Sequence, residues 1–366
     1  MLDVIIVGAG QAGLVMGYYL RQGNYNFVLL DGEKRIGDSW RKRYDSLQLF
    51  TPRAYCTLPG MKLEGNENEF PTKDEISNYL EAYAQRFSLP VRLQTNVFKV
   101  RKREDEFEVY TPKEVLRSKR VIIASGAFDQ PFIPSISQNL SNDIFQIHSS
   151  QYQSPKQIPE GAVLVVGGGN SGAQIAVELA KSRDVTIAVS HPLSFLPLKI
   201  MGRSIFSWLK KIGLLYAGTH TRRGRWFQKQ RDPIFGYECR ELIRNGTITV
   251  KPKVVNALRN KVVFSDDNTC QVQNVVWSTG FIPNYHWIDV EGAVNQAGLP
   301  VHTRGVSGMQ GLYYIGLPWQ HQRGSALLCG VGRDAEFLFS IIRKEDSMLI
   351  KNRSVAIPTD QQYVHN

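Results

Sequence analysis

The stretch VIIVGAGQAGLVMGYYLRQGNYNFVLLD, residues 4–31, decides the fold of this chain. Residues 4–7 are apolar, as expected of a parallel strand covered on both faces, and three glycines follow in GxGxxG spacing. A second apolar strand, residues 27–30, leads directly to Asp31. Strand, glycine turn, helix and strand in this order predict a unit that binds a dinucleotide.

The residues of the glycine turn each have a physical role. Gly8 permits the tight turn, Gly10 lets the main chain approach a pyrophosphate, and Gly13 lets the helix pack close to the strand. Phosphate charge then meets the N-terminus of the helix, where Gln11 and Ala12 lie. These five residues are therefore predicted to hold the first cofactor.

The same spacing occurs a second time. Residues 163–166 form another apolar strand, and GGGNSG at 167–172 precedes a predicted helix over residues 173–181. Two such turns imply two dinucleotides. The candidate binding residues of the second turn are Gly167, Gly169, Asn170, Ser171 and Gly172.

The two units differ at the end of their second strand. Asp31 follows Gly8 by 23 residues and can accept hydrogen bonds from both ribose hydroxyls of an adenosine. The same offset from Gly167 gives Ser190, followed by His191. A carboxylate there would repel a 2′-phosphate, whereas a hydroxyl beside an imidazole, with Arg183 near in sequence, tolerates or binds one. We therefore expect FAD in the first site and NADPH, rather than NADH, in the second.

Length and motif order predict an α/β protein with two Rossmann-like dinucleotide-binding domains. The chain has 366 residues, enough for two domains of ordinary size. We expect a discontinuous FAD domain, residues 1–155 and 273–366, with the NADPH domain inserted at residues 156–272.

Composition excludes several classes of function. The chain is 42% hydrophobic and 21% charged, and no apolar run is long enough to span a membrane. Its beginning enters the first strand at once, which leaves no room for a signal peptide, and its four cysteines form no CxxC pair or zinc knuckle. We expect a cytoplasmic protein with no integral membrane association and no metal site.

The net charge of +11 raises the question of nucleic acid. Its densest cluster, within residues 222–231, lacks any known reading module, so a solvated face is the better interpretation and no nucleic-acid partner is expected. This cluster belongs to an unusually long segment, residues 195–230, in which one or two amphipathic helices are predicted. A lid over a substrate pocket or a homodimer contact is the first interpretation; membrane-surface docking and plain solvated decoration are the alternatives.

The order of further motifs resembles that of a known family. After the first unit come G-x-x-W at residues 37–40, the pair Arg43-Tyr44 and LFTP at residues 49–52. Together with the two glycine turns, this order resembles the flavin-containing monooxygenases and their plant and bacterial relatives. The resemblance extends over nearly the whole chain, and only the H-x-x-x-Y half of the family's identifying motif is present, at His148 and Tyr152.

The resemblance implies further cofactor contacts. In the family the G-x-x-W segment lies against FAD, a later residue passes the adenine, and two A-T-G elements lie near the phosphates and between the cofactors. These features carry over to Gly37, Ser39 and Trp40, to Val97, to Ala124, Ser125 and Gly126, and to Thr279 and Gly280.

The last cofactor element is expected at residues 311–336. A helix predicted to start near Ser325 would direct its N-terminus at the flavin and stabilise negative charge that develops on reduction. Gln320, His321 and Arg323 are the polar candidates beside the flavin, and a turn held by its own hydrogen bonds is the alternative. By the resemblance, Lys73, at the start of a capped amphipathic helix, stands where animal monooxygenases have an active-site asparagine. Lys73 and His321 are the candidate catalytic residues, and for Lys73 an exposed first-turn lysine is the alternative.

The function implied by the resemblance is an NADPH-dependent flavin monooxygenase. Hydride would pass from NADPH to FAD, and a C4a-hydroperoxyflavin formed with O2 would deliver one oxygen atom to a small organic substrate, such as a sulfide, an amine or an activated carbon. Two alternatives remain. One is an NADPH oxidoreductase that reduces a quinone or O2 without oxygen insertion, and the other is a slow-turnover flavin-binding sensor protein.

Overall fold

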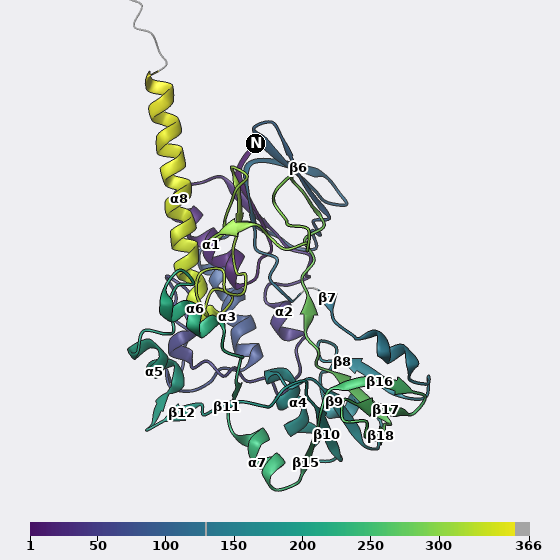
Figure 1. Ribbon diagram of the computed structural model, residues 1–366. Helices are drawn as coiled ribbons and strands as arrows, with labels where there is room; N and C mark the ends of the chain where they lie inside the picture. The colour runs from purple at the N-terminus through teal and green to yellow at the C-terminus, as the bar shows by residue number, and fades with distance from the viewer. Residues whose placement is uncertain (129, 356–366) are drawn as a thin grey trace, which may run out of the picture.

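Two sheets, each flanked by helices, form the body of the molecule (Figure 1). The computed structural model describes residues 1–128 and 130–355, with side chains described as far as residue 348. Residues 356–366, which the sequence analysis assigns to the first domain, lie outside the described residues. Within the described residues, no helix is both long enough and apolar enough to cross a membrane.

The first sheet has ten strands drawn from both ends of the chain. Its path runs β21-β4-β5-β6-β1-β2-β3, and β24 pairs in parallel with the second half of β6. The predicted discontinuous first domain is therefore confirmed. Its strands are β1 (Leu2–Val7), β2 (Phe27–Leu30), β3 (Val91–Arg92), β4 (Lys99–Arg103), β5 (Glu106–Tyr110), β6 (Val115–Ile123), β21 (Ile288–Asp289), β22 (His302–Thr303), β23 (Val306–Ser307) and β24 (Leu312–Tyr314).

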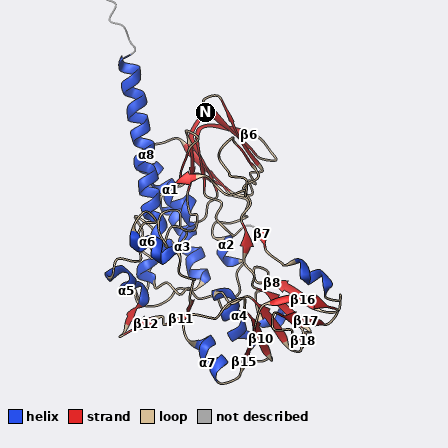
Figure 2. Cartoon of the chain, viewed as in Figure 1, coloured by secondary structure: helices blue, strands red, loops and turns tan. Residues whose placement is uncertain are grey.

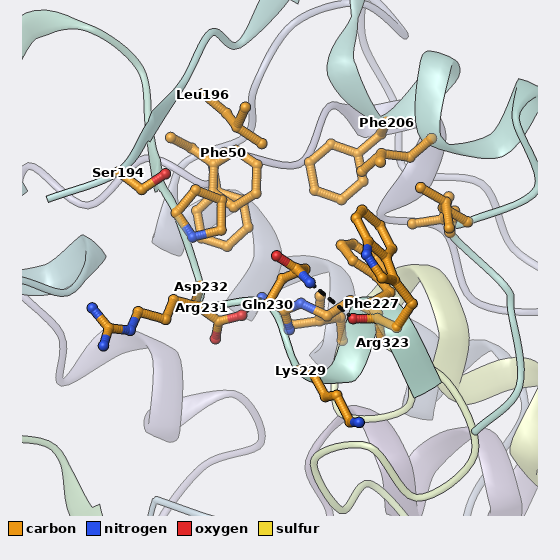
Figure 3. A pocket seen from close by; sticks show the side chains of 17 residues that line it. Phe50, Ser194, Leu196, Phe206, Phe227, Lys229, Gln230, Arg231, Asp232 and Arg323 are labelled. Carbon is orange, nitrogen blue, oxygen red and sulfur yellow. Dashed lines mark hydrogen bonds and ion pairs between the residues drawn. The ribbon is translucent and has the colours of Figure 1, made fainter. Parts of the chain in front are cut away.

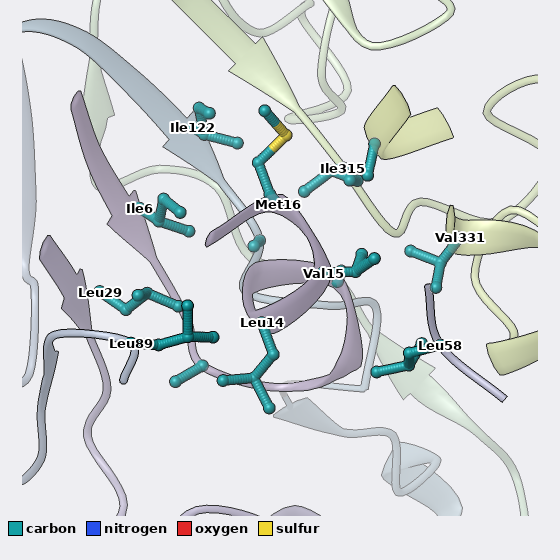
Figure 4. Close-up of a cluster of buried hydrophobic side chains, with 14 of the residues drawn as sticks. Ile6, Leu14, Val15, Met16, Leu29, Leu58, Leu89, Ile122, Ile315 and Val331 are labelled. Atoms are coloured by element: carbon teal, nitrogen blue, oxygen red, sulfur yellow. The ribbon is translucent and has the colours of Figure 1, made fainter. Parts of the chain in front are cut away.

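Helices α1 (Gln11–Gln22), α3 (Lys73–Arg86) and α8 (Leu328–Val355) bury their apolar faces against this sheet and one another. Figure 4 shows α1 in the centre of the resulting core, with Leu14, Val15 and Met16 fully buried between strand and helix side chains. Helix α3 begins as predicted, because the Thr72 hydroxyl accepts a hydrogen bond from the N–H of Glu75 and the Glu75 carboxylate accepts one from the N–H of Thr72. This core fixes the first glycine turn relative to α8.

The second sheet has five parallel strands in the order β15-β10-β9-β19-β8. Strands β8 and β19 both belong to this sheet, so the sheet extends beyond the expected boundaries, residues 156 and 272, and takes in strands from residue 145 to residue 277. The strands are β8 (Phe145–His148), β9 (Val163–Val166), β10 (Val185–Ala188), β15 (Ile248–Lys251) and β19 (Asn274–Trp277). A small antiparallel sheet of β16 (Val254–Leu258), β17 (Lys261–Phe264) and β18 (Thr269–Gln271) covers one side, and α4 (Asn170–Leu179) and α7 (Glu238–Arg244) pack on the domain.

The long segment at residues 195–230 contains two helices, as predicted. They are α5 (Ile205–Lys211) and α6 (Arg222–Gln228), accompanied by the short strands β11 (Phe195–Leu196), β12 (Lys199–Ile200), β13 (Arg203–Ser204) and β14 (Ile234–Phe235). Although the segment belongs to the second domain in sequence, it lies beside the first, on the side of α3 and α8 (Figures 1 and 2). Its apolar side chains pack on Phe50 and Tyr55 of the first domain.

The chain crosses between the domains twice, and the crossings run side by side. Strands β7 (Gln130–Pro131) and β20 (Phe281–Ile282) form an antiparallel ribbon there. The remaining helices are α2 (Asp38–Arg41), η1 (Arg53–Tyr55), η2 (Ser135–Asn139) and η3 (Pro155–Gln157).

Two predicted helix starts are wrong by three residues. Helix α4 begins at Asn170 instead of 173, directly after its N-cap Gly169. Helix α8 begins at Leu328 instead of near Ser325, because the Ser325 hydroxyl accepts hydrogen bonds from the N–H groups of His321 and Gln322 and closes a turn.

Candidate functional site

The two glycine turns have matching geometry. Gly8 and Gly167 have positive φ values of +107° and +119°. A Cβ on Gly8 would lie 2.5 Å from the Ala124 oxygen, and one on Gly167 would lie 2.2 Å from the Ser278 oxygen. The third glycines behave alike as well. A Cβ on Gly13 would lie 1.9 Å from the Gly8 oxygen, and one on Gly172 would lie 2.1 Å from the Gly167 oxygen. Packing and backbone conformation within the protein therefore require glycine at these four positions.

The middle glycines are different. A Cβ on Gly10 or on Gly169 would meet nothing within 4 Å, so the fold leaves open space at both positions. Their backbone is ordinary, with φ of −75° and −84°. Neither packing nor backbone strain explains these two glycines, whereas a pyrophosphate lying on the main chain does. Both turns therefore fit a dinucleotide.

Asp31 lies against the first glycine turn. Its Oδ2 accepts a hydrogen bond from the N–H of Ala9 at 2.6 Å, and its Oδ1 accepts one from Glu33 at 2.8 Å. These bonds fix the carboxylate at the carboxyl end of β2, the position from which ribose hydroxyls are bound.

In the second domain, Ser190 is exposed after the end of β10, and His191 follows with its Nδ1 3.3 Å from the Pro192 oxygen. Arg183 lies before the opposite end of β10 and donates to the Ile158 oxygen at 2.7 Å, so the geometry does not support its suggested help at Ser190. The cation that the sequence analysis missed is Lys251. It pairs with Ala188 at the carboxyl end of β15, the same edge as Ser190.

Gln11 joins three segments predicted to surround the flavin. Its Oε1 accepts a hydrogen bond from the Trp40 indole at 3.4 Å, and its Nε2 donates to the Ala326 oxygen at 3.3 Å. Gly37 has φ of +87° and packs closely on Ser77 of α3, while Ser39 is exposed on α2. The glycine turn, the G-x-x-W segment and the turn before α8 are therefore brought together.

Val97 packs at the edge of the core beneath the carboxyl end of the first sheet. Ala124 is buried, and its carbonyl oxygen packs against Gly8. Ser125 is exposed. Ala12 is buried and contacts the position where a Cβ on Gly316 would lie, at 2.8 Å.

The two candidate hinge glycines both face open space. Gly126 and Gly280 have φ of +78° and +84°, and a Cβ on either would meet nothing within 4 Å. The Thr279 hydroxyl donates to the Phe132 oxygen, which ties one crossing to the other. The two residues of the half motif are structural: the buried His148 imidazole lies 3.0 Å from the Gly280 oxygen, and the Tyr152 hydroxyl donates to Glu178 of α4 at 2.7 Å.

The side chain of Asn170 is occupied. Its Nδ2 donates to the Pro233 oxygen at 3.0 Å and its Oδ1 accepts from the N–H of Phe235 at 2.9 Å. The end of the inserted segment is thus fastened to the second glycine turn. Ser171, the next residue, is exposed.

Lys73 is buried and its ammonium is occupied. It donates to the Arg41 oxygen and to Asp74, both at 3.2 Å, and lies 3.8 Å from Asp45. These contacts join α3 to the loop that follows α2. The alternative of an exposed lysine is therefore wrong, and the catalytic role stays a prediction.

The turn before α8 is held by its own hydrogen bonds. Ser325 accepts two backbone N–H groups, and the Gln320 side chain accepts from Leu317 at 3.3 Å. The His321 ring stacks on His220 at 5.3 Å and faces a cavity of about 560 Å³ that Arg304 also borders. Burial, together with Arg304 and His220, lowers the pKa of His321 to about 4, so this imidazole is neutral at pH 7.

A cavity of about 580 Å³ lies where the inserted segment meets the first domain (Figure 3). Arg323 and Asp232 both line it and pair with each other at 2.9 Å, while Lys229 and Arg231 extend away from the aromatic rings in Figure 3. Arg323 comes from the turn predicted to face the flavin. The apolar wall includes Phe50, Leu196, Phe206, Trp226, Phe227 and Phe235.

Residues 5–195, more than half of the chain, match the pyridine nucleotide-disulphide oxidoreductase family. The chain belongs to that family. As a member of the pyridine nucleotide-disulphide oxidoreductase family, it is an enzyme, and an oxidoreductase. An uncharacterized oxidoreductase CzcO-like of Geobacillus kaustophilus (strain HTA426) is 50% identical over 342 residues, which cover 93% of this chain and 98% of the relative.

The predicted resemblance to flavin monooxygenases is also confirmed. The probable indole-3-pyruvate monooxygenase YUCCA8 of Arabidopsis thaliana is 28% identical over 368 residues, which cover 88% of this chain and 86% of that protein. The structure of a flavin-containing monooxygenase from Stenotrophomonas maltophilia matches with a TM-score of 0.80 at 24% identity, covering 94% of this chain and 98% of the other. The structural likeness confirms the predicted two-domain fold.

Proposed function

We propose that the protein is an FAD-dependent, NADPH-consuming monooxygenase that inserts one oxygen atom from O2 into a small organic substrate. The observation that carries the proposal is the apolar cavity of about 580 Å³ between the turn before α8 and the inserted segment. An oxidoreductase that merely passes electrons to O2 has no need of such a cavity, whereas an oxygenase must hold its substrate beside the flavin, away from water.

The two cofactors have separate sites in this proposal. FAD lies on the first glycine turn, with Asp31 on its ribose and its ring near Trp40 and the turn before α8. NADPH lies on the second turn, with Ser190, His191 and Lys251 at the end of its adenosine half. FAD, once bound, supplies the hydride acceptance and the oxygen chemistry. The protein's own part is to bind, to orient and to exclude water.

The substrate cavity gives the inserted segment its role. The ring of Phe50 stacks on that of Phe235 with 4.4 Å between the ring centres and an angle of 13° between the ring planes. The ring centres of Phe206 and Phe235 are 5.8 Å apart. These flat apolar surfaces suit a small organic molecule, and the segment acts as a lid that keeps water from it. A homodimer contact through the same segment remains the alternative.

The proposal assigns no catalytic role to a side chain. His321 is neutral at neutral pH and lies on the side of the second cavity, and Lys73 is engaged in structural bonds. Their predicted catalytic roles stay predictions. We further propose a cytoplasmic location, since the four thiols are free and suit a reducing compartment.

Disulfide reduction is the rival that the family name suggests. The sequence contains no CxxC pair. Burial raises the pKa of the Cys239 thiol to about 11 and that of Cys329 to about 12, and it also raises the pKa of Cys56. Protonated thiols are poor nucleophiles, which favours oxygenation over thiol exchange.

The test is isotopic. The FAD-loaded protein is supplied with NADPH and ¹⁸O₂ together with a panel of small sulfides, amines and 2-oxo acids, and products are analysed by mass spectrometry. The panel includes indole-3-pyruvate, which the name of the plant relative gives as that protein's substrate. One ¹⁸O per product, with NADPH consumed in equal amount, supports the proposal. Hydrogen peroxide equal to the NADPH consumed, with no labelled product for any compound, favours the oxidoreductase alternative. A protein that binds FAD and does not oxidise NADPH favours the sensor.

A further inference from the structure

Arg43 lies where the two crossings between the domains meet. Its guanidinium carbon is 5.6 Å from the centre of the Phe128 ring and 5.3 Å from that of Phe281. Phe128 lies close before β7 in the first crossing, and Phe281 begins β20 in the second. The two ring centres are themselves 5.2 Å apart, so Arg43 is a cation placed beside a pair of aromatic rings where the two crossings meet.

This cation has no anionic partner within the described part of the chain. Its sequence neighbours are paired: Arg41 binds Asp38 and Glu81, and Lys42 binds Glu33. For Arg43 the described residues provide neither an ion pair nor a side-chain hydrogen bond. None of its nitrogen atoms is sealed in the protein interior, so the N–H donors of the guanidinium face open space.

The described groups around Arg43 leave its charge uncompensated. Burial lowers the pKa of the nearby His148, as does the positive charge of Arg43, so that imidazole is neutral at pH 7. The following carboxylate, Asp45, pairs with Lys73 at 3.8 Å. Cation–π contacts offset part of the desolvation cost, but they bring no negative charge. Among the described residues, no anion compensates the charge of Arg43.

The neighbouring side chain indicates which anion belongs there. The Tyr44 hydroxyl donates to Gln174 of α4 at 2.5 Å, and the Tyr44 ring packs against Tyr152 at 6.3 Å. The pair Arg43-Tyr44 therefore extends from the domain crossing to the helix whose N-terminus is the second glycine turn. Gly280, in the adjacent crossing, faces open space.

We propose that Arg43, a residue of the first domain, binds the pyrophosphate of the nicotinamide dinucleotide held by the second domain. The inference rests on the nucleotide assignment of the proposed function, but not on oxygen insertion. A guanidinium can donate two parallel hydrogen bonds to phosphate oxygens, and α4 adds the positive end of its dipole from the other side. The bound nucleotide thereby contacts both domains and holds them together.

The experiment measures nucleotide binding directly, by calorimetry on FAD-loaded protein. Arg43→Gln should raise the Kd for NADP⁺ about tenfold or more, which corresponds to about 1.4 kcal/mol. It should raise the Kd for NAD⁺ by the same factor, because both nucleotides carry the pyrophosphate. Arg43→Lys should recover part of the affinity, since the charge returns without the paired donors. The matched control is Lys42→Gln, which removes one exposed charge from the next position and should change neither Kd.

Three results would overturn the inference. The first is unchanged Kd values for both nucleotides in Arg43→Gln. The second is a loss confined to NADP⁺, which would place the residue at the 2′-phosphate. The third is a changed flavin reduction potential with normal nucleotide binding, which would assign Arg43 to the flavin. Flavin content and Tm of each variant establish that it is folded, and Arg43→Lys supplies the comparison if Arg43→Gln is not. Failure of the ¹⁸O experiment with intact Arg43-dependent binding would reject the monooxygenase and leave this inference standing.

Discussion

In the proposed function, the side chain at the end of strand β10 selects between NADPH and NADH. Ser190 is exposed there, at the edge that Lys251 also reaches. We predict that Ser190→Asp raises the KM for NADPH at least about tenfold and leaves the KM for NADH within about twofold, because a carboxylate repels the 2′-phosphate and accepts ribose hydroxyls. Initial rates of NADPH and NADH oxidation check this.

The control for that substitution lies at the other end of the same strand. Ser182 is exposed before β10, so Ser182→Asp adds the same charge away from the edge where the nucleotide binds. Equal effects of the two substitutions on NADPH would mean that the second turn does not place the 2′-phosphate at Ser190.

Asp334 is a second residue with a measurable signature. It is fully buried, neither carboxyl oxygen has a hydrogen-bond partner within the described residues, and Oδ1 is 3.9 Å from the Arg304 Nε. Burial raises the pKa of Asp334, and Ser325, Arg304 and Arg333 offset part of that rise. The folded state therefore holds this proton more tightly than the unfolded state, and stability is lost as the pH rises from the ordinary carboxyl pKa through the raised one.

Asp334→Asn removes this dependence. We predict that the Tm of the variant, compared with that of the natural protein, improves as the pH rises from 4 to 8. Scanning calorimetry of the cofactor-free proteins at several pH values measures the difference. A difference in Tm that stays constant with pH would show that folding does not raise the pKa of Asp334.

At the scale of the element, different glycines of the first strand–turn–helix unit serve folding and cofactor binding. Gly10 faces open space, whereas Gly13 is pressed against the Gly8 oxygen. We predict that Gly10→Val costs about 1 kcal/mol of stability, as an apolar N-cap does, yet lowers the FAD content of the purified protein at least about tenfold. Gly13→Ala should cost about 3 kcal/mol or more, because its methyl group collides with backbone.

The measurements are flavin absorbance and denaturant unfolding of the cofactor-free proteins. A Gly10→Val protein that keeps full flavin content would show that no phosphate lies on this turn. In the second domain, Gly169→Val should in the same way abolish binding of the nicotinamide dinucleotide and spare the flavin.

The same scale shows what the sequence could predict. Both glycine turns could be predicted from local spacing, because the close approach of helix to strand at Gly13 and Gly172 arises within each unit, and strand β9 has the predicted bounds. Pairing between distant strands leaves no local signal. The sequence therefore gave no sign that β8 and β19 complete the second sheet, or that Lys251 rather than Arg183 shares the edge of Ser190.

The candidate site was predicted less fully than the fold. Trp40 and Gln11 meet as expected from motifs, but the aromatic cavity draws Phe50 from one domain and Phe206 from the other. The alternative of an exposed Lys73 rested on the usual exposure of lysines in the first turn of a helix. Its burial could not be predicted, because its partner Asp45 comes from a loop with no recognisable pattern. Side chains that meet only through tertiary packing are invisible to periodicity.

At the scale of the whole molecule, the inserted segment fastens one domain to the other. Phe50 stacks on Phe206 and Phe235 across the interface. We predict that Phe50→Ala loosens the segment locally and speeds tryptic cleavage within residues 222–231 severalfold, while flavin content stays unchanged. Phe98→Ala, which removes a ring that is 52% exposed and outside this cluster, is the control and should leave the cleavage rate unchanged. Cleavage that does not accelerate in Phe50→Ala would mean that the segment is held by other contacts.

The pairing of β24 with β6 determines the order in which a nascent chain can mature. Residues 145–277 are contiguous and leave the ribosome early, so their sheet can form during synthesis, whereas the first sheet waits for residues 312–314 and for the helix that follows. Uptake of the flavin therefore has to follow the synthesis of β24. A chain that terminates prematurely after the second domain would present a completed nucleotide fold attached to an open sheet edge, which is the kind of product that cellular quality control removes.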